Sequence, residues 1–236
     1  MKKILGLLRN TIQENNLIEE GETIGVGISG GKDSMALLYE LKKLKKFSLV
    51  KFKIHAIKIN IGFESEEDNK IIEDFCKSLD IPLTIEYSDI GTVVFDIKKS
   101  KSPCALCANM RRGALASVAN RLNIKKIALG HHKDDKVETF FMNMLYSGRL
   151  NTFQVKSYLS RTDITIIRPF YNVDEHLINS FVKEYNIPIV KSNCIVDKNT
   201  KREEIKEFLK EIYPKFKGSK KSIENALINK DQFNLF

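Results

Sequence analysis

The sequence predicts an α/β fold in which helices alternate with the strands of a parallel sheet, followed by a short helical tail. Short apolar runs alternate with amphipathic stretches over most of the chain, and this alternation is typical of βαβ units. The chain has 236 residues, of which 42% are hydrophobic, so it can bury the core of one large domain. It contains no internal repeat and no low-complexity linker.

The elements follow from the apolar periodicity in order along the chain. The first helix places Ile4, Leu7, Leu8 and Ile12 on one face, which is the 3.6-residue period of an amphipathic helix. By the same criterion, helices are expected at residues 1–19, 32–46, 65–80, 108–122, 134–148 and 174–186. Strands are expected at residues 21–29, 51–60, 83–89, 125–130 and 163–170, with an extended segment at 187–194. A polar crossing is expected at 90–103, and two helical segments follow Lys201, separated at 214–218.

The composition changes near residues 190–200, where the α/β alternation gives way to a mostly helical tail. This change predicts three segments. They are an N-terminal helix at residues 1–20, the α/β domain at residues 21–190 and the C-terminal tail at residues 191–236.

The net charge and the distribution of apolar residues restrict the cellular compartment and the binding partners that we expect for the protein. Lys and Arg number 39 against 30 Asp and Glu, a net charge of +9, which fits either a lysine-rich surface or a polyanionic partner such as RNA. The apolar run in the first ten residues is too short for a signal peptide and lacks a cleavage site. No segment approaches the roughly 20 apolar residues that span a bilayer. We therefore expect a cytoplasmic protein without a membrane partner, whose four cysteines are thiols or metal ligands.

The stretch "GVGISGGKDS" at residues 25–34 has three chemically different interpretations. A dinucleotide fingerprint needs its first glycine at the turn after a strand, but Gly25 and Gly27 fall inside the apolar run. A Walker A loop needs a glycine where Val26 stands and a Mg²⁺-binding hydroxyl where Asp33 stands. Both interpretations are therefore disfavoured.

The remaining interpretation is a strand, a glycine-rich turn and a helix that together hold a pyrophosphate. Two adjacent glycines let the backbone approach an anion closely, and a helix N-terminus offers free N–H groups and a positive dipole end. Lys32 adds a cation, and Asp33 can cap the helix or hold Mg²⁺. The expected nucleotide-binding residues of this loop are Ser29, Gly30, Gly31, Lys32, Asp33 and Ser34.

The cysteines form a second motif. Cys104 and Cys107 lie two residues apart in "PCALC", just before an expected helix, and Cys194 lies in another expected loop. Three cysteines suit a [4Fe–4S] cluster with one open iron, or zinc with a histidine or water as fourth ligand. Alone, the C-x-x-C pair also fits a zinc half-site or a redox pair. Cys76 is expected on the apolar side of a helix as a buried core thiol.

A third motif, "ALGHHKDDKVETFFMN", follows an expected strand. Gly130 allows close backbone approach, and Asp134 and Glu138 are i, i+4 neighbours with Asp135 in the same first helical turns. Acids there are stabilised by the helix dipole, so capping explains any one of them. Two histidines followed by two aspartates exceed what capping needs, which favours contact with a metal or with Mg²⁺–ATP.

These motifs carry a resemblance to a known family. "SGGKDS" resembles the PP-loop of the ATP pyrophosphatase superfamily, whose members cleave ATP between the α and β phosphates. "SGGKDS", "PCALCANMRRGAL" and "KIALGHHKDDKVETFFMNMLYSG", in that order, look like the tRNA 2-thiocytidine synthetases, the TtcA family. The similarity continues through "IRPF", "NIPIV", a cysteine and "KREEIKEFL", and runs from about residue 22 to about residue 225.

The resemblance implies a Rossmann-like PP-loop ATP pyrophosphatase domain, also described as adenine nucleotide alpha hydrolase-like. It implies a tRNA thiolase that uses ATP, Mg²⁺ and a [4Fe–4S] cluster, adenylates a cytidine carbonyl in the anticodon loop and releases AMP and pyrophosphate. The sulfur donor would be sulfide or the product of a cysteine desulfurase, and a homodimer is left open. The implied catalytic residues are Lys32, Asp33, Asp134 and Asp135, Gly130 joins the nucleotide site, and the cluster ligands are Cys104, Cys107 and Cys194.

The chain departs from the family pattern at one point, and other activities use the same loop. Family members often show a second C-x-x-C near the C-terminus, whereas "KSNCIVDKNTKRE" has only Cys194, at the position of the second cysteine. A lysidine synthetase would need no cysteines, and a 2-thiouridine synthetase would usually carry further C-x-x-C zinc modules. A non-catalytic nucleotide-binding iron–sulfur or zinc sensor is the alternative of a different class.

Three dense basic groups predict where RNA phosphates bind. Two of them flank the cysteine pair in sequence, so we expect them near the sulfur site. Phosphate contacts would make binding depend steeply on salt. The groups are Lys98-Lys99-Lys101, Arg111-Arg112 and Lys215-Lys217-Lys220-Lys221.

Overall fold

The computed structural model describes residues 2–98, 103–191, 194 and 200–229. The chain divides into two compact units. The sheet unit comprises Met1–His132 and Gln154–Ile195, and the helical unit comprises Lys133–Phe153 and Val196–Phe236. Residues 133–153 thus group with the C-terminal segment, whereas the sequence alone places them in the central domain.

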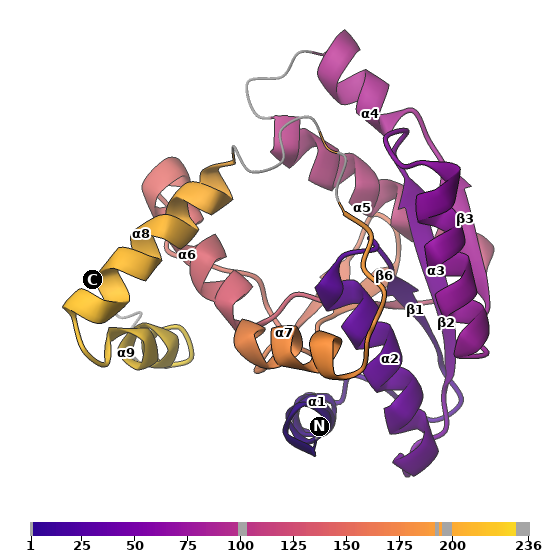
Figure 1. The fold of residues 1–236 in the computed structure, drawn as a ribbon, viewed down its shortest axis with the longest axis horizontal. Helices are drawn as coiled ribbons and strands as arrows, with labels where there is room; N and C mark the ends of the chain where they lie inside the picture. The colour runs from indigo at the N-terminus through magenta and orange to yellow at the C-terminus, as the bar shows by residue number, and fades with distance from the viewer. Residues whose placement is uncertain (1, 99–102, 192–193, 195–199, 230–236) are drawn as a thin grey trace. The chain divides into compact units, whose positions relative to one another are not determined.

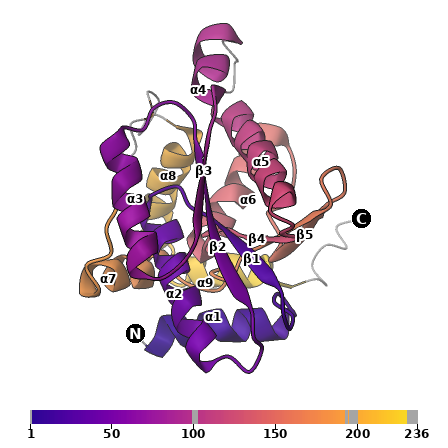
Figure 2. The same cartoon turned by 90° about the vertical axis from the view of Figure 1, so that its right-hand side faces the viewer.

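A six-stranded sheet forms the centre of the sheet unit, as the alternation of strands and helices predicts (Figure 2). Its order is β3-β2-β1-β4-β6-β5, and every neighbouring pair is parallel except β5 and β6. The strands are β1 Thr23–Gly27, β2 Lys53–Asn60, β3 Leu83–Tyr87, β4 Lys126–Ala128, β5 Lys156–Leu159 and β6 Ile164–Ile167. The antiparallel edge strand β5 is not expected from the sequence, because its residues are only half-buried or exposed and form no apolar run.

Helices cover both faces of this sheet (Figure 1). One core cluster joins α1, α2, α3 and α7 to β1, and the other joins α4, η1 and α5 to β2. The helices of this unit are α1 Lys2–Glu14, α2 Lys32–Phe47, α3 Glu66–Ser78, α4 Ile90–Thr92, the π-helical turn η1 Val93–Ile97, α5 Pro103–Arg121 and α7 Glu175–Glu184. The expected parallel α/β architecture is confirmed.

The alternation along β1 explains why its glycines belong to the strand and not to a turn. Ile24 and Val26 are fully buried on the face that carries α2, while Gly25 and Gly27 face the opposite side. A Cβ atom on Gly27 would lie 2.8 Å from Leu129 and 3.2 Å from Leu115. Gly27 therefore serves the close packing of α5 on the sheet, and Gly25 packs against Ile57 and Ile124. Both glycines belong to the strand, so they are not a dinucleotide fingerprint.

Two segments differ from the sequence-based expectation. α5 begins at Pro103 and not near residue 108, because proline is well accommodated in the first turn of a helix. Cys104 and Cys107 consequently lie inside the first turns of α5 and not before the helix. The segment expected as a polar crossing contains α4 and η1, whose Ile90 and Val94 are buried.

The helical unit is built from α6 Lys133–Ser147, α8 Lys201–Lys215 and α9 Ser219–Ala226. Val137 of α6 packs with Ile205 and Leu209 of α8 in a small core of its own. The two expected helical segments after residue 200 are confirmed, although α8 continues through Pro214 and α9 starts after Gly218, which has φ +83°. Among the helices that the structure describes, none has the length and apolar character needed to cross a membrane.

Candidate functional site

The loop between β1 and α2 is held by two serines. The Ser34 hydroxyl accepts the Ser29 N–H at 3.1 Å and donates to the Gly31 carbonyl at 3.0 Å. The two hydroxyl oxygens lie 3.1 Å apart, and the Ser29 oxygen accepts the Gly31 N–H at 3.3 Å. Both serines belong to the expected nucleotide-binding residues, and their hydrogen bonds fix the shape of the loop.

Gly30 is the position where the loop needs a glycine. Its φ is +83°, and a Cβ atom there would lie 2.9 Å from Cβ of Val190 and 3.2 Å from Ile72. The Val190 N–H donates to the Gly30 carbonyl at 3.0 Å. The segment that follows α7 therefore closes over the loop and fixes its backbone.

Gly130 lies beside the same loop. A Cβ atom on this glycine would lie 2.8 Å from the carbonyl carbon of Asp33 and 3.0 Å from the nitrogen of Ser34. Gly130, two residues after the end of β4, thus lies against the first turn of α2. The expected close backbone approach is present, with the protein's own backbone as the neighbour.

Lys32 lies between two carboxylates. Its Nζ atom donates to Asp33 at 2.9 and 3.2 Å and to Oε1 of Glu175 at 2.8 Å. Burial opposes the charged form, but the Asp33 and Glu175 carboxylates outweigh it and raise the pKa of Lys32. The cation expected in this loop is therefore held protonated.

Asp33 is part of the same network and does not cap α2. The N-cap residue is Gly31, without a side-chain capping hydrogen bond. Asp33 Oδ1 lies 3.8 Å from Nε2 of the buried His132. The four residues Glu175, Lys32, Asp33 and His132 form one continuous polar group, which we call the loop network.

Glu175 is the member of this network that the sequence does not reveal. It is the first residue of α7, and an acid in a first helical turn is ordinarily explained by the helix dipole. Its partner is 143 residues away in the chain. Only the position of α7 on the face of the sheet that carries α2 brings the two side chains together.

The three cysteines of the second motif lie in the sheet unit. Cys104 is exposed, whereas Cys107 and Cys194 are half-buried. Burial and the charge of Cys194 raise the pKa of Cys104. Burial raises the pKa of Cys107 as well, Arg111 lowers it, and Cys194 and Cys104 raise it further. The three thiols therefore interact electrostatically across two segments of the chain.

Among the described residues, no three His, Cys, Asp or Glu side chains are grouped as a metal-binding set. The three thiols nevertheless interact electrostatically. Three ionised thiols repel one another, so bringing them together requires a cation to offset that repulsion.

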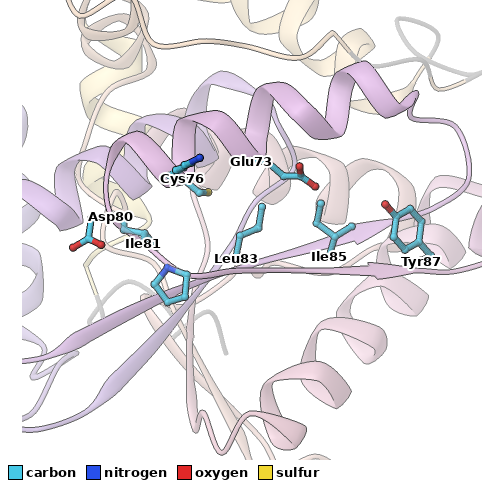
Figure 3. A pocket seen from close by; sticks show the side chains of 9 residues that line it. Glu73, Cys76, Asp80, Ile81, Leu83, Ile85 and Tyr87 are labelled. Carbon is cyan, nitrogen blue, oxygen red and sulfur yellow. The ribbon is translucent and has the colours of Figure 1, made fainter.

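Cys76 is a core thiol, as expected. It is 1% exposed in α3, and burial raises its pKa to about 12. It lines a pocket between α3 and the edge strand β3, together with Ile81 and Leu83 (Figure 3). Thiolate formation at Cys76 is therefore unfavourable, which separates it chemically from the other three cysteines.

The acids of the third motif lie in the helical unit, on α6. Asp134 accepts from Lys220 at 2.7 Å, and Asp135 and Glu138 accept from Arg202 at 2.8 and 3.0 Å. Burial raises the pKa of Glu138 to about 7, although Lys206 opposes this. Each of these acids pairs with a cation of α8 or α9 in the same unit.

The basic groups divide between the two units. In the sheet unit, Lys98 and Arg112 are exposed and Arg111 is half-buried, while Lys99 and Lys101 lie outside the described residues. In the helical unit, Lys220 binds Asp134. The exposed members of the helical unit's group are Lys215, Lys217 and Lys221.

Comparisons with known proteins agree with this arrangement. The ATP-binding PP-loop domain family matches residues 3–212. A tRNA-cytidine(32) 2-sulfurtransferase from Dichelobacter nodosus is 35% identical, with 99% of this chain and 91% of the relative covered. Another, from Pelobacter propionicus, is 34% identical, with 90% of this chain and 80% of the relative covered.

Solved structures show the same fold. The U34-tRNA thiolase NcsA from Methanococcus maripaludis, solved with its [4Fe-4S] cluster, superimposes with a TM-score of 0.78 at 22% identity, covering 96% of this chain and 77% of that one. NMN synthetase from Francisella tularensis superimposes with a TM-score of 0.54 at 15% identity, covering 96% and 92%.

Proposed function

This chain belongs to the ATP-binding PP-loop family and, within it, to the tRNA-cytidine(32) 2-sulfurtransferases, and we propose that it thiolates a cytidine of the tRNA anticodon loop at the expense of ATP. The observation that carries the proposal is the loop network. A protonated lysine and an aspartate lie at a glycine turn between a strand and a helix N-terminus. That combination suits a polyphosphate.

ATP would bind with its phosphates at the loop of residues 28–34. The free N–H groups of the first turn of α2 and the ammonium group of Lys32 would stabilise the negative charge that develops on the departing pyrophosphate. The carbonyl oxygen of the base attacks the α-phosphorus, the bond from that phosphorus to the bridging oxygen breaks, and pyrophosphate leaves. The base then carries AMP on its oxygen, and attack by a sulfur nucleophile at that carbon displaces AMP.

Mg²⁺ would neutralise the phosphates in this reaction. Asp33 is the proposed protein ligand in the sheet unit, because its carboxylate lies in the loop itself. Asp134 and Asp135 remain proposed ligands from the third motif. Each of those two would have to exchange its present cation, Lys220 or Arg202, for the metal.

A [4Fe–4S] cluster would be held by Cys104, Cys107 and Cys194. The donor set fits by type, since iron–sulfur clusters are ligated by cysteine thiolates, and the electrostatic interaction among these thiols supports their proximity. Bound there, the cluster would supply a position at which a sulfur atom is held and delivered. Arg111, which lowers the pKa of Cys107, would favour the thiolate form that such ligation requires.

The RNA would be recognised by phosphate contacts near the cysteine pair. Lys98 and Arg112 are exposed in the sheet unit. A base in an anticodon loop is accessible without opening a duplex, and this suits chemistry on its carbonyl.

The direct test is mass spectrometry of tRNA nucleosides from cells with and without this gene. The proposal expects 2-thiocytidine to disappear when the gene is deleted and to return with the wild-type gene. If 2-thiouridine disappears while 2-thiocytidine is unchanged, the base that this protein modifies is a uridine and not a cytidine. In vitro, under anaerobic conditions, ATP and tRNA should yield AMP and pyrophosphate, and a protein that binds ATP but forms no AMP with any tRNA would be a non-catalytic nucleotide sensor.

A further inference from the structure

We infer that Glu175 is a positioning residue, which orients the ammonium group of Lys32 for contact with the phosphates of ATP. The inference rests on the proposed function and adds to it a residue outside all three sequence motifs. It is carried by a side chain from α7 that reaches the loop between β1 and α2. Glu175 accepts a hydrogen bond from Nζ of Lys32 at 2.8 Å, the shortest contact that Lys32 makes in the loop network.

The hydrogen bonds of Lys32 fix the orientation of its ammonium group. A lysine ammonium group has three N–H donors. Asp33 accepts through both carboxylate oxygens, at 2.9 and 3.2 Å, and Glu175 accepts at 2.8 Å. The two carboxylates come from different elements, so together they hold the ammonium group in one position, whereas Asp33 alone would leave the group free to rotate about its stem.

Glu175 is presented by a rigid element. Tyr39 of α2 packs on Phe181 of α7 and on Tyr185, the residue that follows α7, with ring centroids 5.7 and 5.5 Å apart, and Phe181 and Tyr185 lie 4.7 Å apart. Nζ of Lys43 lies 4.0 Å from the centroid of Tyr185. Aromatic and cation–π contacts of this kind fix α7 on α2, the helix that begins with Lys32.

The segment after α7 adds a second restraint on the same loop. The Val190 N–H donates to the Gly30 carbonyl at 3.0 Å. The stretch from Glu175 to Val190 therefore contacts the loop twice, through its first residue and through its last residue. One contact restrains the backbone of the loop and the other restrains its cation. Side chains locked by packing in this way position a reacting group better than mobile loop residues do.

Reach and charge can be separated by substitution at this position. Glu175→Gln keeps the length of the side chain and a carbonyl acceptor but removes the negative charge. Glu175→Asp keeps the charge but is one methylene shorter, so it cannot accept at the same distance. If Glu175 acts by orienting Lys32, the length of its side chain matters more than its charge, so Glu175→Asp should impair the enzyme more than Glu175→Gln. If Glu175 acts only through its negative charge, the order of the two variants should be reversed.

The experiment compares Glu175→Gln, Glu175→Asp and the matched control Glu184→Gln, at the far end of α7. Steady-state AMP formation with tRNA gives kcat and KM for ATP. In parallel, the rate at which an amine reagent labels Lys32 is followed by mass spectrometry without ATP. We expect Glu175→Asp to lower kcat about ten- to a hundredfold with KM changed less than about threefold, the scale of one lost charge-assisted hydrogen bond. Its Lys32 should label several-fold faster, and Glu175→Gln should stay within about fivefold of wild type in both measurements.

Equal kcat and equal Lys32 labelling in wild type and a folded Glu175→Asp variant would overturn the inference. So would a Glu175→Gln variant that loses more activity than Glu175→Asp, because charge would then matter more than reach. If the wild-type protein forms no AMP, the proposed function fails instead. The labelling rates still decide whether Glu175 orients Lys32, since labelling does not require turnover.

Discussion

The loop of residues 28–34 and the three cysteines of the second motif lie in the same unit, yet the polypeptide holds them in opposite ways. In the loop, Ser29 and Ser34 bind each other and the backbone, and Lys32 bridges two carboxylates. At Cys104 and Cys107, burial and neighbouring sulfur charges raise the pKa values. Opposite charges stabilise the loop network, whereas like charges would destabilise an ionised set of thiols.

This difference has a physical consequence for how the two sites form. A network of opposite charges and hydrogen bonds can be complete in the folded chain before any ligand binds. Three thiols lose protons and converge only when a cation offsets their repulsion, so metal binding and thiol ionisation are coupled. The loop is therefore expected to tolerate loss of its ligand, and the cysteine site is expected to depend on its metal.

The largest expected effect is on catalysis at the loop. Asp33→Ala should lower AMP formation about a hundred- to a thousandfold, because a charged group that contacts the reacting phosphates is lost. The melting temperature should stay close to wild type, since Lys32 retains Glu175. Asp74→Ala, at an exposed position of α3, is the matched control. Products other than AMP and pyrophosphate, namely ADP and phosphate, would contradict the proposed chemistry.

The cysteine site should lose its metal when any one ligand is removed. Cys104→Ala, Cys107→Ala and Cys194→Ala should each fall well below the roughly four irons per chain of a [4Fe–4S] protein after anaerobic reconstitution. Cys76→Ala should retain iron, because that thiol is buried in the core of α3. Iron and zinc are measured by elemental analysis together with the absorption spectrum. An iron-free Cys76→Ala protein beside an iron-loaded Cys194→Ala protein would refute this ligand set.

The loop can be destabilised by a substitution that leaves its charged residues unchanged. Gly30→Ala places a Cβ atom 2.9 Å from Val190 at a φ of +83°, and we expect a loss of about 2–4 kcal/mol in the free energy of unfolding. Gly21→Ala is the matched control, because Gly21 has φ +79° with no atom within 4 Å of the added Cβ. The difference between the two variants in urea unfolding isolates the contact with Val190. Equal losses would mean that the segment after α7 does not restrain the loop.

The helix that carries the loop should also show a pH dependence. Glu40 of α2 is fully buried, neither carboxylate oxygen has a hydrogen-bond partner among the described residues, and burial raises its pKa from 4.5 to about 7. The Glu40 carboxyl loses its proton at a lower pH in the unfolded chain than in the folded protein. The free energy of unfolding therefore falls as pH rises from about 4.5 to about 7, by up to about 3 kcal/mol, and the loss is complete above pH 7. Glu40→Gln should therefore be more stable than wild type at pH 8 by about 1–3 kcal/mol, with little difference at pH 4.5. Urea unfolding at both pH values measures this, with the exposed Glu67→Gln as control, and an equal difference at the two pH values would contradict it.

The smallest expected effect concerns RNA binding beside the cysteines. The double variant Arg111→Gln with Arg112→Gln should flatten the dependence of log affinity on log salt by about one unit per lost phosphate contact. Filter binding of tRNA over a salt series measures the slope, and circular dichroism checks folding. Replacing Lys45 and Lys46, both exposed at the end of α2, gives the matched control. A folded Arg111, Arg112 double variant with an unchanged slope would remove this surface from the proposed RNA contact.

The loop could be located from sequence because its determinants are local. A strand, two glycines and a helix start within ten residues of one another, and each follows from spacing and propensity. The partners that complete the loop network could not be located, because Glu175 and Val190 are distant in the chain and ordinary in type. Their role arises from strand order, which places α7 on the same face as α2.

The cysteine site shows the reverse pattern. Its candidate residues are recognisable from spacing, but the spacing does not predict their local structure, because α5 begins at Pro103 and includes Cys104 and Cys107 in its first turns. The edge strand β5 was missed for a related reason, since its residues are half-exposed and lack an apolar run. Residue type indicates chemistry well, whereas exposed edges and helix starts depend on neighbours that the local sequence does not reveal.

The closure of the loop by Val190 also bears on how the protein is made. Gly30 leaves the ribosome early, but the N–H group that restrains it belongs to a residue synthesised 160 positions later. Contacts of such high sequence separation slow folding, because the chain entropy between them is lost before they form. The restraint on Gly30 can therefore form only after the segment that follows α7 has been synthesised. Until then the nascent chain exposes the part of α2 that α7 covers, and apolar surface exposed in this way during folding favours aggregation.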